Sequence, residues 1–466
     1  MNDSSAGEGP ALGAFSGGLL AVHAHPDDET LSTGGLIATF AAAGLPVCVV
    51  TCTRGERGEV LALPGTTSEG LAGLEGDGPA LGAHRETELA AALDRLAGVD
   101  GAVGHAFLDA LPRVNAQVDG VVNPSSAPGA GQAVTPGAGP GLAPTSSGRV
   151  RYEDSGMAWV APGVAGPAPD SPPTAFARVP LDEPAGRLAL LIRARRPAVV
   201  VTYEPGGGYG HPDHVRAHEV TVRALELAAD PAWFPGADAR ATRAEGVPVR
   251  GGGPVADGGR PDGVLVSGGW PAADVEQAGG AVVRGGESAG GVGQRGEPWA
   301  EAELWQAVAP AAQVRAARAT LAALPEARAL AAHHGLALPD PHEDLPPFAG
   351  EDLPPFVGGG LPGWSAGRRV VGGSDRGLPI ARTGGIAVVD VRAVLGRVVA
   401  GLRAHATQVQ HADVLPEAVD DVAGWYALSN DVLAPILTTE TYAVACRPSP
   451  SRPKFLRSPT AQSEAT

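Results

Sequence analysis

The stretch 18–30 constrains the fold more than any other part of this chain. A short apolar run at 19–22 has the length and the glycine boundary that are typical of a buried strand. His25, Asp27 and Asp28 follow within a few residues, and a helical pattern rich in alanine comes next. Open α/β sheets bind ligands at the carboxyl ends of their strands. The stretch therefore predicts a strand, a polar turn that can bind a ligand, and a helix ending near residue 43.

The alternation of strands and helices continues along the chain. Further strands are predicted at about 46–53, 102–107, 198–202, 386–391 and 439–445, and further helices at about 83–97, 182–195, 212–229, 301–334 and 418–430, with one more ending near 406. Alternation of this kind is typical of a parallel sheet that is covered by helices on both faces. We therefore expect an α/β fold, with a Rossmann-like parallel sheet flanked by helices.

Glycine and proline define the expected domain organisation. The chain has 67 glycines and 44 prolines, concentrated in a few segments that lack apolar periodicity. We expect one domain over 17–446 that carries long Gly/Pro-rich inserts. The inserts are placed at about 109–149, 236–297 and 335–383, and flexible tails at 1–16 and 447–466.

Charge and cysteine content limit the partners and the compartment. The net charge of −17 argues against binding to nucleic acid or to an anionic membrane, and no protein partner is evident. Cys48 and Cys52 lie four apart in one predicted strand, too far apart for a disulfide, so free thiols in a reducing compartment are expected. The chain shows neither a signal peptide nor a membrane span, which predicts a soluble cytoplasmic protein.

A second polar cluster, 203–214, follows the predicted strand at 198–202. His211 and His214 lie three apart where a helix begins, so both imidazoles can face one cleft. Together with His25 and Asp28, His214 makes a set of two histidines and one carboxylate, which suits Zn²⁺ or Fe²⁺ with open positions. The alternative is that each cluster only begins a helix and carries solvated side chains.

The neighbouring side chains match the needs of hydrolysis at such a metal. Asp27 can take a proton from water and His211 can give one to a leaving group. Tyr209 can stabilise an oxyanion. Asp213 is expected to orient one of the histidines.

The segments 24–29 and 208–214 resemble the two signatures of the LmbE-like (N-acetylglucosaminyl-phosphatidylinositol) deacetylases. Supporting similarity lies at 51–56, 154–157, 402–408 and 425–430, and the resemblance is strongest to the actinobacterial members that serve mycothiol biosynthesis. It implies a zinc enzyme that hydrolyses the acetamide of the pseudodisaccharide N-acetylglucosaminyl-inositol.

The resemblance also implies roles for individual residues. It makes His25, Asp28 and His214 the zinc ligands, Asp27 the general base, His211 the general acid and Tyr209 the residue acting on the oxyanion. It places Arg85 and Asp154 on the substrate, with Met157 beside it on a mobile element. Arg57 departs from the acidic residue expected at its position, and the inserts depart from the compact length of the family.

The sequence also leaves two rival functions open. The related mycothiol S-conjugate amidases typically carry a lysine seven residues after the first metal histidine, where this chain has Ser32. A short neutral residue favours a substrate whose acyl group is only acetyl. A metal-stabilised carbohydrate-binding protein without turnover is the non-enzymatic alternative, and Asp27 argues against it because a structural site has no use for the extra carboxylate.

Overall fold

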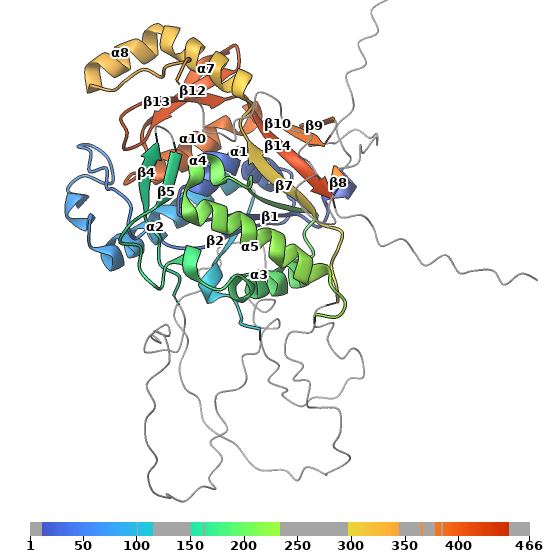
Figure 1. Ribbon diagram of the computed structural model, residues 1–466. Helices are drawn as coiled ribbons and strands as arrows, with labels where there is room; N and C mark the ends of the chain where they lie inside the picture. Colours follow the sequence, from blue (N-terminus) through green and yellow to red (C-terminus); the bar gives the residue numbers. More distant parts are fainter. Residues whose placement is uncertain are drawn as a thin grey trace, which may run out of the picture.

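A large sheet lies at the centre of the molecule with helices on its faces (Figure 1). The computed structural model describes residues 12–99, 101–114, 151–161, 164–233, 297–343, 365–366, 378–383 and 385–446. The strands of the sheet are β1 (Leu19–His23), β2 (Val47–Thr51), β3 (Gly104–Phe107), β6 (Val199–Tyr203), β7 (Glu303–Val308), β8 (Ser365–Ala366), β9 (Ile380–Thr383), β10 (Ile386–Asp390) and β14 (Thr439–Cys446).

The strand order is β3-β2-β1-β6-β7-β14-β10-β9, and β8 pairs with β14. The first five strands are mutually parallel, which confirms the predicted parallel sheet for this half. The strands β14, β10 and β9 continue the sheet in antiparallel pairing, as does β8. The sheet as a whole is therefore mixed, with the parallel half built from the N-terminal part of the chain and β7.

Helices cover both faces of the parallel half. The helices are α1 (Asp28–Ala42), α2 (Gly78–Ala97), α3 (Asp182–Arg195), α4 (Gly207–Gly210), α5 (Pro212–Ala229), α7 (Ala311–Ala323), α8 (Pro325–His334) and α10 (Leu395–Ala404). Leu19 and Ala21 of β1 join the core under α1, α2 and α10, whereas Leu20 and Val22 join the core under α3 and α5. Strands buried on both faces explain why the sequence shows continuous apolar runs there.

A half-buried carboxylate connects β14 to α1. Glu440 accepts hydrogen bonds from the backbone N–H groups of Gly35 and Leu36 at 2.6 and 2.8 Å and from the Tyr442 hydroxyl at 2.5 Å. Burial raises the pKa of the Glu440 carboxyl, although these three donors favour its charged form. The helix that begins at the first polar cluster is thereby fixed to the C-terminal part of the sheet.

The helix predicted at 418–430 is wrong, because this region forms strands. The strands β11 (Gln410–Val419), β12 (Val422–Ala427) and β13 (Leu433–Leu437) form a separate antiparallel sheet that packs on α7 and α8. Asp420, with φ 51°, makes the turn between β11 and β12. A Cβ at Gly424 would lie 2.2 Å from the Asp413 carbonyl oxygen, so glycine is needed where the two strands approach.

The predicted helix at 301–334 is wrong over its first part. Residues 303–308 form β7 between β6 and β14, and α7 and α8 occupy only the remainder. The burial of Leu304, Trp305 and Gln306 in succession fits a strand with neighbours on both sides. Pairing with strands distant in sequence therefore decided the conformation of a segment whose local pattern was compatible with a helix.

Some predicted tail and insert boundaries also need correction. Residues 12–15 form a 3₁₀ helix, and Phe15 is buried against Phe40 and Trp305, so the packed region begins before residue 17. Residues 380–383 form β9 inside the third proposed insert, and Leu111 is buried inside the first. The remaining parts of the proposed inserts and tails, chiefly 1–11, 115–149, 236–296, 344–364, 367–377 and 447–466, lie outside the described residues.

Two further expectations concern single features. Cys48 and Cys52 are buried free thiols, as predicted. In the described part of the chain, no helix combines the length and hydropathy that crossing a bilayer requires.

A short hairpin completes the fold. It consists of β4 (Met157–Ala161) and β5 (Val164–Pro167), which pair with each other outside the main sheet. It lies beside α4 in Figure 1, and β5 contacts both α4 and α5.

Candidate metal centre and active site

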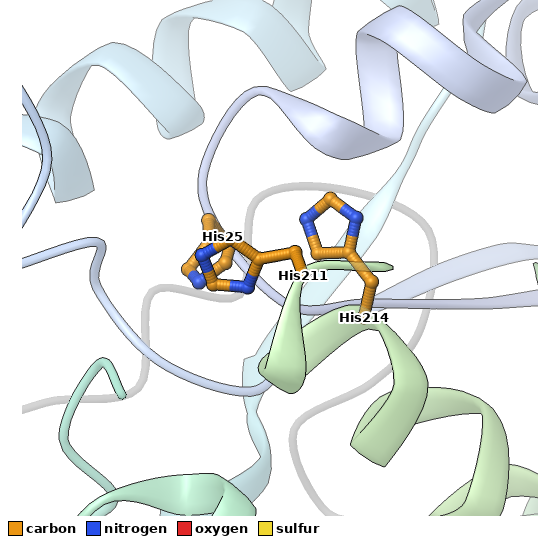
Figure 2. A group of neighbouring side chains, drawn as sticks. All are labelled: His25, His211 and His214. Carbon is orange, nitrogen blue, oxygen red and sulfur yellow. The ribbon is translucent and has the colours of Figure 1, made fainter. Parts of the chain in front are cut away.

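The two polar clusters meet where the strand order reverses. From β1 the chain proceeds to β2 and β3 on one side, while β6 and β7 occupy the other. The carboxyl ends of β1 and β6 are adjacent because these strands are parallel neighbours. His25 follows β1, and His211 and His214 follow β6 at the start of α5 (Figure 2). This is the topological switch point at which open α/β sheets bind ligands.

The first loop has an unusual backbone conformation at Asp27, with φ 124° and ψ −35°. A non-glycine residue in that region is strained, and strain of this kind is found at functional sites. Contacts from both sides hold the conformation: the Asp27 N–H donates to Glu29 at 3.0 Å, and the Gln408 amide donates to the Pro26 carbonyl at 2.6 Å. The half-buried Asp27 side chain is thus presented by a backbone that other residues fix.

Glu29 is itself held by a buried ion pair with His405. The His405 Nε2 lies 2.8 Å from Glu29 Oε1, and both side chains are fully buried. The pKa of His405 is raised despite its burial because of the Glu29 charge. The pKa of Glu29 is lowered despite its burial, chiefly by His405. The sequence offered little sign of this pair, because an isolated histidine at a helix end is more often a solvated residue.

The expected metal ligands converge on one carboxylate oxygen. Asp28 Oδ2 lies 3.2 Å from His25 Nδ1 and 3.3 Å from His214 Nε2. A tetrahedral zinc site with bonds of about 2.0–2.1 Å separates its ligand atoms by about 3.3 Å. Each of these two distances therefore matches an edge of such a site.

The other nitrogen of each of these histidines has a hydrogen-bond partner that sets the tautomer. His25 Nε2 lies 3.3 Å from Asp213 Oδ2, and His214 Nδ1 lies 3.2 Å from the Gly207 carbonyl oxygen. A carbonyl oxygen only accepts, so His214 Nδ1 carries the proton and Nε2 keeps its lone pair free. Asp213 likewise orients His25, and partners of this kind are typical around metal-binding histidines.

His211 belongs to the same cluster but is bonded differently. One nitrogen atom from each of His25, His211 and His214 can be chosen so that all three lie within 4.8 Å of one another. The Nδ1 of His211, however, accepts the backbone N–H of Asp213 at 3.2 Å and so begins α5. Neutral His211 therefore carries its proton on Nε2, which leaves no free lone pair for a metal.

The cluster has more carboxylates than cations around it. Although burial disfavours the charged form, Asp154, Asp213 and Asp28 raise the pKa of His25 well above its ordinary value. Burial, together with the charge of Asp28, raises the pKa of Asp27 to about 8. A group of buried carboxylates with N and O donors suits a divalent cation, whose charge would offset their repulsion.

Two tyrosines approach His214. Tyr209 has its ring centroid 5.2 Å from that of His214, on a short helical turn after Gly207 and Gly208. Tyr203, for which the sequence indicated no role, stacks on His214 at 4.3 Å, and its hydroxyl accepts the Ala24 N–H at 2.9 Å. Its place as the last residue of β6, next to the cluster, was the available signal.

The predicted substrate residues lie around the centre in different settings. Asp154 Oδ1 is 3.8 Å from His25 Nε2, and Met157 begins β4 close by in sequence. Arg85 is buried and donates to the carbonyl oxygens of Gly55 and Glu59 at 2.5 and 2.9 Å, so it shapes the loop after β2. The Ser32 hydroxyl donates to the Asp28 carbonyl at 2.5 Å. Contact of these four predicted residues with a substrate stays a prediction.

Asp154 also lines a cavity of about 680 Å³ beside the centre. Polar loop residues dominate its wall, and cavities of this size accommodate a small organic ligand. The lining residues are Glu56, Arg57, Gly58, Glu59, Glu75, Gly76, Gly78, Pro79, Arg151, Glu153, Asp154 and Pro172. The unexpected Arg57 is paired here with Asp170 at 2.6 Å, and its backbone N–H donates to Asp154 at 3.1 Å.

Comparison with known protein families shows which family the segment that contains this site resembles. Residues 20–225 match the PIG-L family model, described as GlcNAc-PI de-N-acetylase. The matched segment contains both polar clusters and the parallel strands β1, β2, β3 and β6. Residues 20–225 are thus similar to the PIG-L (LmbE-like) family, as the sequence signatures indicated.

Two of the most similar relatives have the same name. The chain is 43% identical over 211 residues to the 1D-myo-inositol 2-acetamido-2-deoxy-alpha-D-glucopyranoside deacetylase of Kineococcus radiotolerans, covering 45% of each protein. It is 42% identical over 218 residues to the protein of the same name from Streptomyces avermitilis, covering 47% of this chain and 55% of that protein. The matches span about half the length of these relatives.

Among solved structures, the N,N'-diacetylchitobiose deacetylase from Pyrococcus horikoshii is 19% identical, with a TM-score of 0.25. That match covers 46% of this chain and 51% of the other.

Proposed function

We propose that this protein is a zinc-dependent N-deacetylase that hydrolyses the acetamide of 1D-myo-inositol 2-acetamido-2-deoxy-alpha-D-glucopyranoside to the free amine and acetate. The observation that carries the proposal is that His25 Nδ1 and His214 Nε2 each lie at metal-ligand spacing from Asp28 Oδ2, with Asp27 next to Asp28 in the same loop. The names of the relatives supply the substrate. Fe²⁺ is compatible with the same donors.

The proposed cofactor is one divalent ion held by His25 Nδ1, Asp28 and His214 Nε2. An ion bound there would act as a Lewis acid, which would polarise an amide carbonyl and lower the pKa of a water molecule. Asp213 and the Gly207 carbonyl keep the two imidazoles in the tautomers that such binding requires.

The free side chains would carry the proton transfers. Asp27 would take a proton from the attacking water and return it to the leaving nitrogen. His211, with its proton fixed on Nε2, would act as a hydrogen-bond donor to the reacting amide, a narrower role than the general acid expected from sequence. Tyr209 would donate to the developing oxyanion from the His214 side.

The cavity beside Asp154 suits the polyol part of this substrate. Its volume of about 680 Å³ exceeds what an acetyl group needs, and its carboxylates can accept hydrogen bonds from hydroxyl groups. Asp154 belongs to both the cavity and the surroundings of His25, so a sugar in the cavity can present its acetamide at the metal centre.

Acetate release from N-acetylglucosaminyl-inositol by the zinc-reconstituted protein tests the proposal. Chelated protein and the Asp27→Asn variant are the controls, and both should lose turnover. No acetate release from protein that contains one zinc per chain would refute the proposed function.

A further inference from the structure

The hairpin β4–β5 exposes an aromatic side chain close to the candidate active site. Trp159 is 60% exposed and its neighbour Val160 is 65% exposed. Single exposed apolar residues need no explanation, but an exposed tryptophan is costly in water and is frequent at binding surfaces. The position of Trp159 relative to the metal centre therefore decides whether it has a binding role.

The Trp159 ring packs against the Tyr209 ring, which in turn packs against the His214 ring. The two rings lie 5.8 Å apart between centroids with an interplanar angle of 34°, and the Tyr209 ring is in turn 5.2 Å from that of His214. The indole thus extends the aromatic wall of the site outward. Because much of the indole remains exposed, the side chain keeps surface available for a ligand.

Hydrogen bonds and close packing connect the hairpin to the site. Ser155, just before β4, donates its backbone N–H to Asp213 at 2.8 Å, and its hydroxyl bonds the same carboxylate. At the other strand, Gly210 has φ 91°, and a Cβ there would lie 2.7 Å from the Ala165 carbonyl oxygen. A two-stranded hairpin is marginal alone, so these contacts at its root and on α4 hold it in place.

We infer that Trp159 is a substrate-binding residue whose indole packs against the apolar C–H face of the substrate's sugar ring. This inference rests on the proposed function. A pyranose ring presents hydroxyl groups at its edge and C–H groups on its faces, so it needs polar and apolar contacts together. The carboxylate-lined cavity supplies the first, and Trp159 is the exposed aromatic side chain beside Tyr209 that can supply the second.

The inference predicts a change in KM rather than in kcat. Trp159→Ala should raise KM for N-acetylglucosaminyl-inositol on the order of tenfold, with kcat within about twofold of wild type. Trp159→Phe should recover most of the loss because it restores an aromatic face. Val160→Ala, the adjacent and similarly exposed position, is the matched control and should leave both constants unchanged. An acyclic acetamide without a sugar ring should be hydrolysed equally by wild type and Trp159→Ala.

Two outcomes would overturn the inference while leaving the deacetylase intact. Unchanged KM in Trp159→Ala would show that the indole is merely exposed. A fall in kcat alone, on both substrates and without rescue by Phe, would show that it only supports Tyr209.

Binding provides a readout that does not depend on turnover. Calorimetric titration of N-acetylglucosaminyl-inositol into zinc-loaded Asp27→Asn should give an affinity on the order of tenfold weaker when Trp159→Ala is added. If wild type proves inactive but this difference is present, the sugar contact stands and the proposed reaction fails. Equal affinities, or no binding to either protein, would overturn the contact.

Discussion

The buried pair of Glu29 and His405 offers the sharpest test of how the C-terminal part of the chain supports the site. Glu29 accepts the N–H of the strained Asp27 with one oxygen and faces His405 with the other. Replacing His405 by alanine leaves a carboxylate in a fully buried position without its cationic partner. Removing one member of a buried ion pair in this way costs about 3–5 kcal/mol of stability.

The expected result for His405→Ala is a loss of about 3–5 kcal/mol in the free energy of unfolding, measured by urea denaturation of metal-free protein at pH 7. The double variant Glu29→Gln/His405→Ala should recover at least half of that loss, because glutamine carries no charge to bury. His334→Ala is the control, since His334 is exposed, and it should stay within about 0.5 kcal/mol of wild type.

Catalysis supplies a second readout of the same pair. If Glu29 holds Asp27 in place, His405→Ala should lower kcat for the acetamide even in zinc-loaded protein that is fully folded. A loss of stability below about 1 kcal/mol, or no recovery in the double variant, would refute the reading of Glu29 and His405 as a coupled buried pair.

Four further predictions follow from the site and the core. His214→Ala should abolish stoichiometric zinc binding measured by metal analysis, and retention of one tight zinc per chain would contradict the ligand assignment. Asp27→Asn and His211→Ala should each keep zinc but lose turnover by a factor on the order of 10² or more, so near-normal rates in either would remove its role. Wild type should have a higher kcat/KM for N-acetylglucosaminyl-inositol than for a mycothiol S-conjugate, and Ser32→Lys should shift the ratio of these two kcat/KM values toward the conjugate. A wild type that prefers the conjugate would indicate a conjugate amidase instead of the deacetylase. Because desolvation raises the pKa of Glu440, the unfolded chain releases this proton at lower pH than the folded chain, so this group lowers stability as the pH rises above about 4.5. Glu440→Gln should therefore flatten the pH dependence of the unfolding free energy, and an unchanged slope would count against the Glu440 carboxyl as its source.

The sequence was most informative where local pattern and tertiary structure agree. The strands β1, β2 and β6 are mostly apolar because both of their faces are buried. The helices that follow them begin at recognisable proline and acidic positions. It failed at 303–308 and 410–437, where pairing with distant strands outweighs local preference. Nothing in a single sequence states which distant segment will supply that pairing.

The same division applies to the site. The sequence predicted that His25, Asp28 and His214 form one ligand set because each cluster follows the carboxyl end of a predicted strand, where open α/β sheets bind ligands. It could not show that Asp213 accepts a hydrogen bond from His25, or that the Nδ1 of His211 accepts one from a backbone N–H. Both hydrogen bonds depend on side-chain orientation. The pairing of Glu29 with His405 could not be predicted for the same reason, since the two residues lie 376 positions apart in the chain.

The parallel pairing of β1 with β6 joins segments about 180 residues apart in the sequence, with the long segment 115–150 between them. The entropic cost of closing a flexible loop grows only with the logarithm of its length, so doubling such a loop adds only about 0.6 kcal/mol. If Val114 and Arg151 keep their positions on the domain, adding or removing residues between them should change the free energy of folding only slightly. The contact between β1 and β6, which brings the two polar clusters together, therefore does not require a short connection between them.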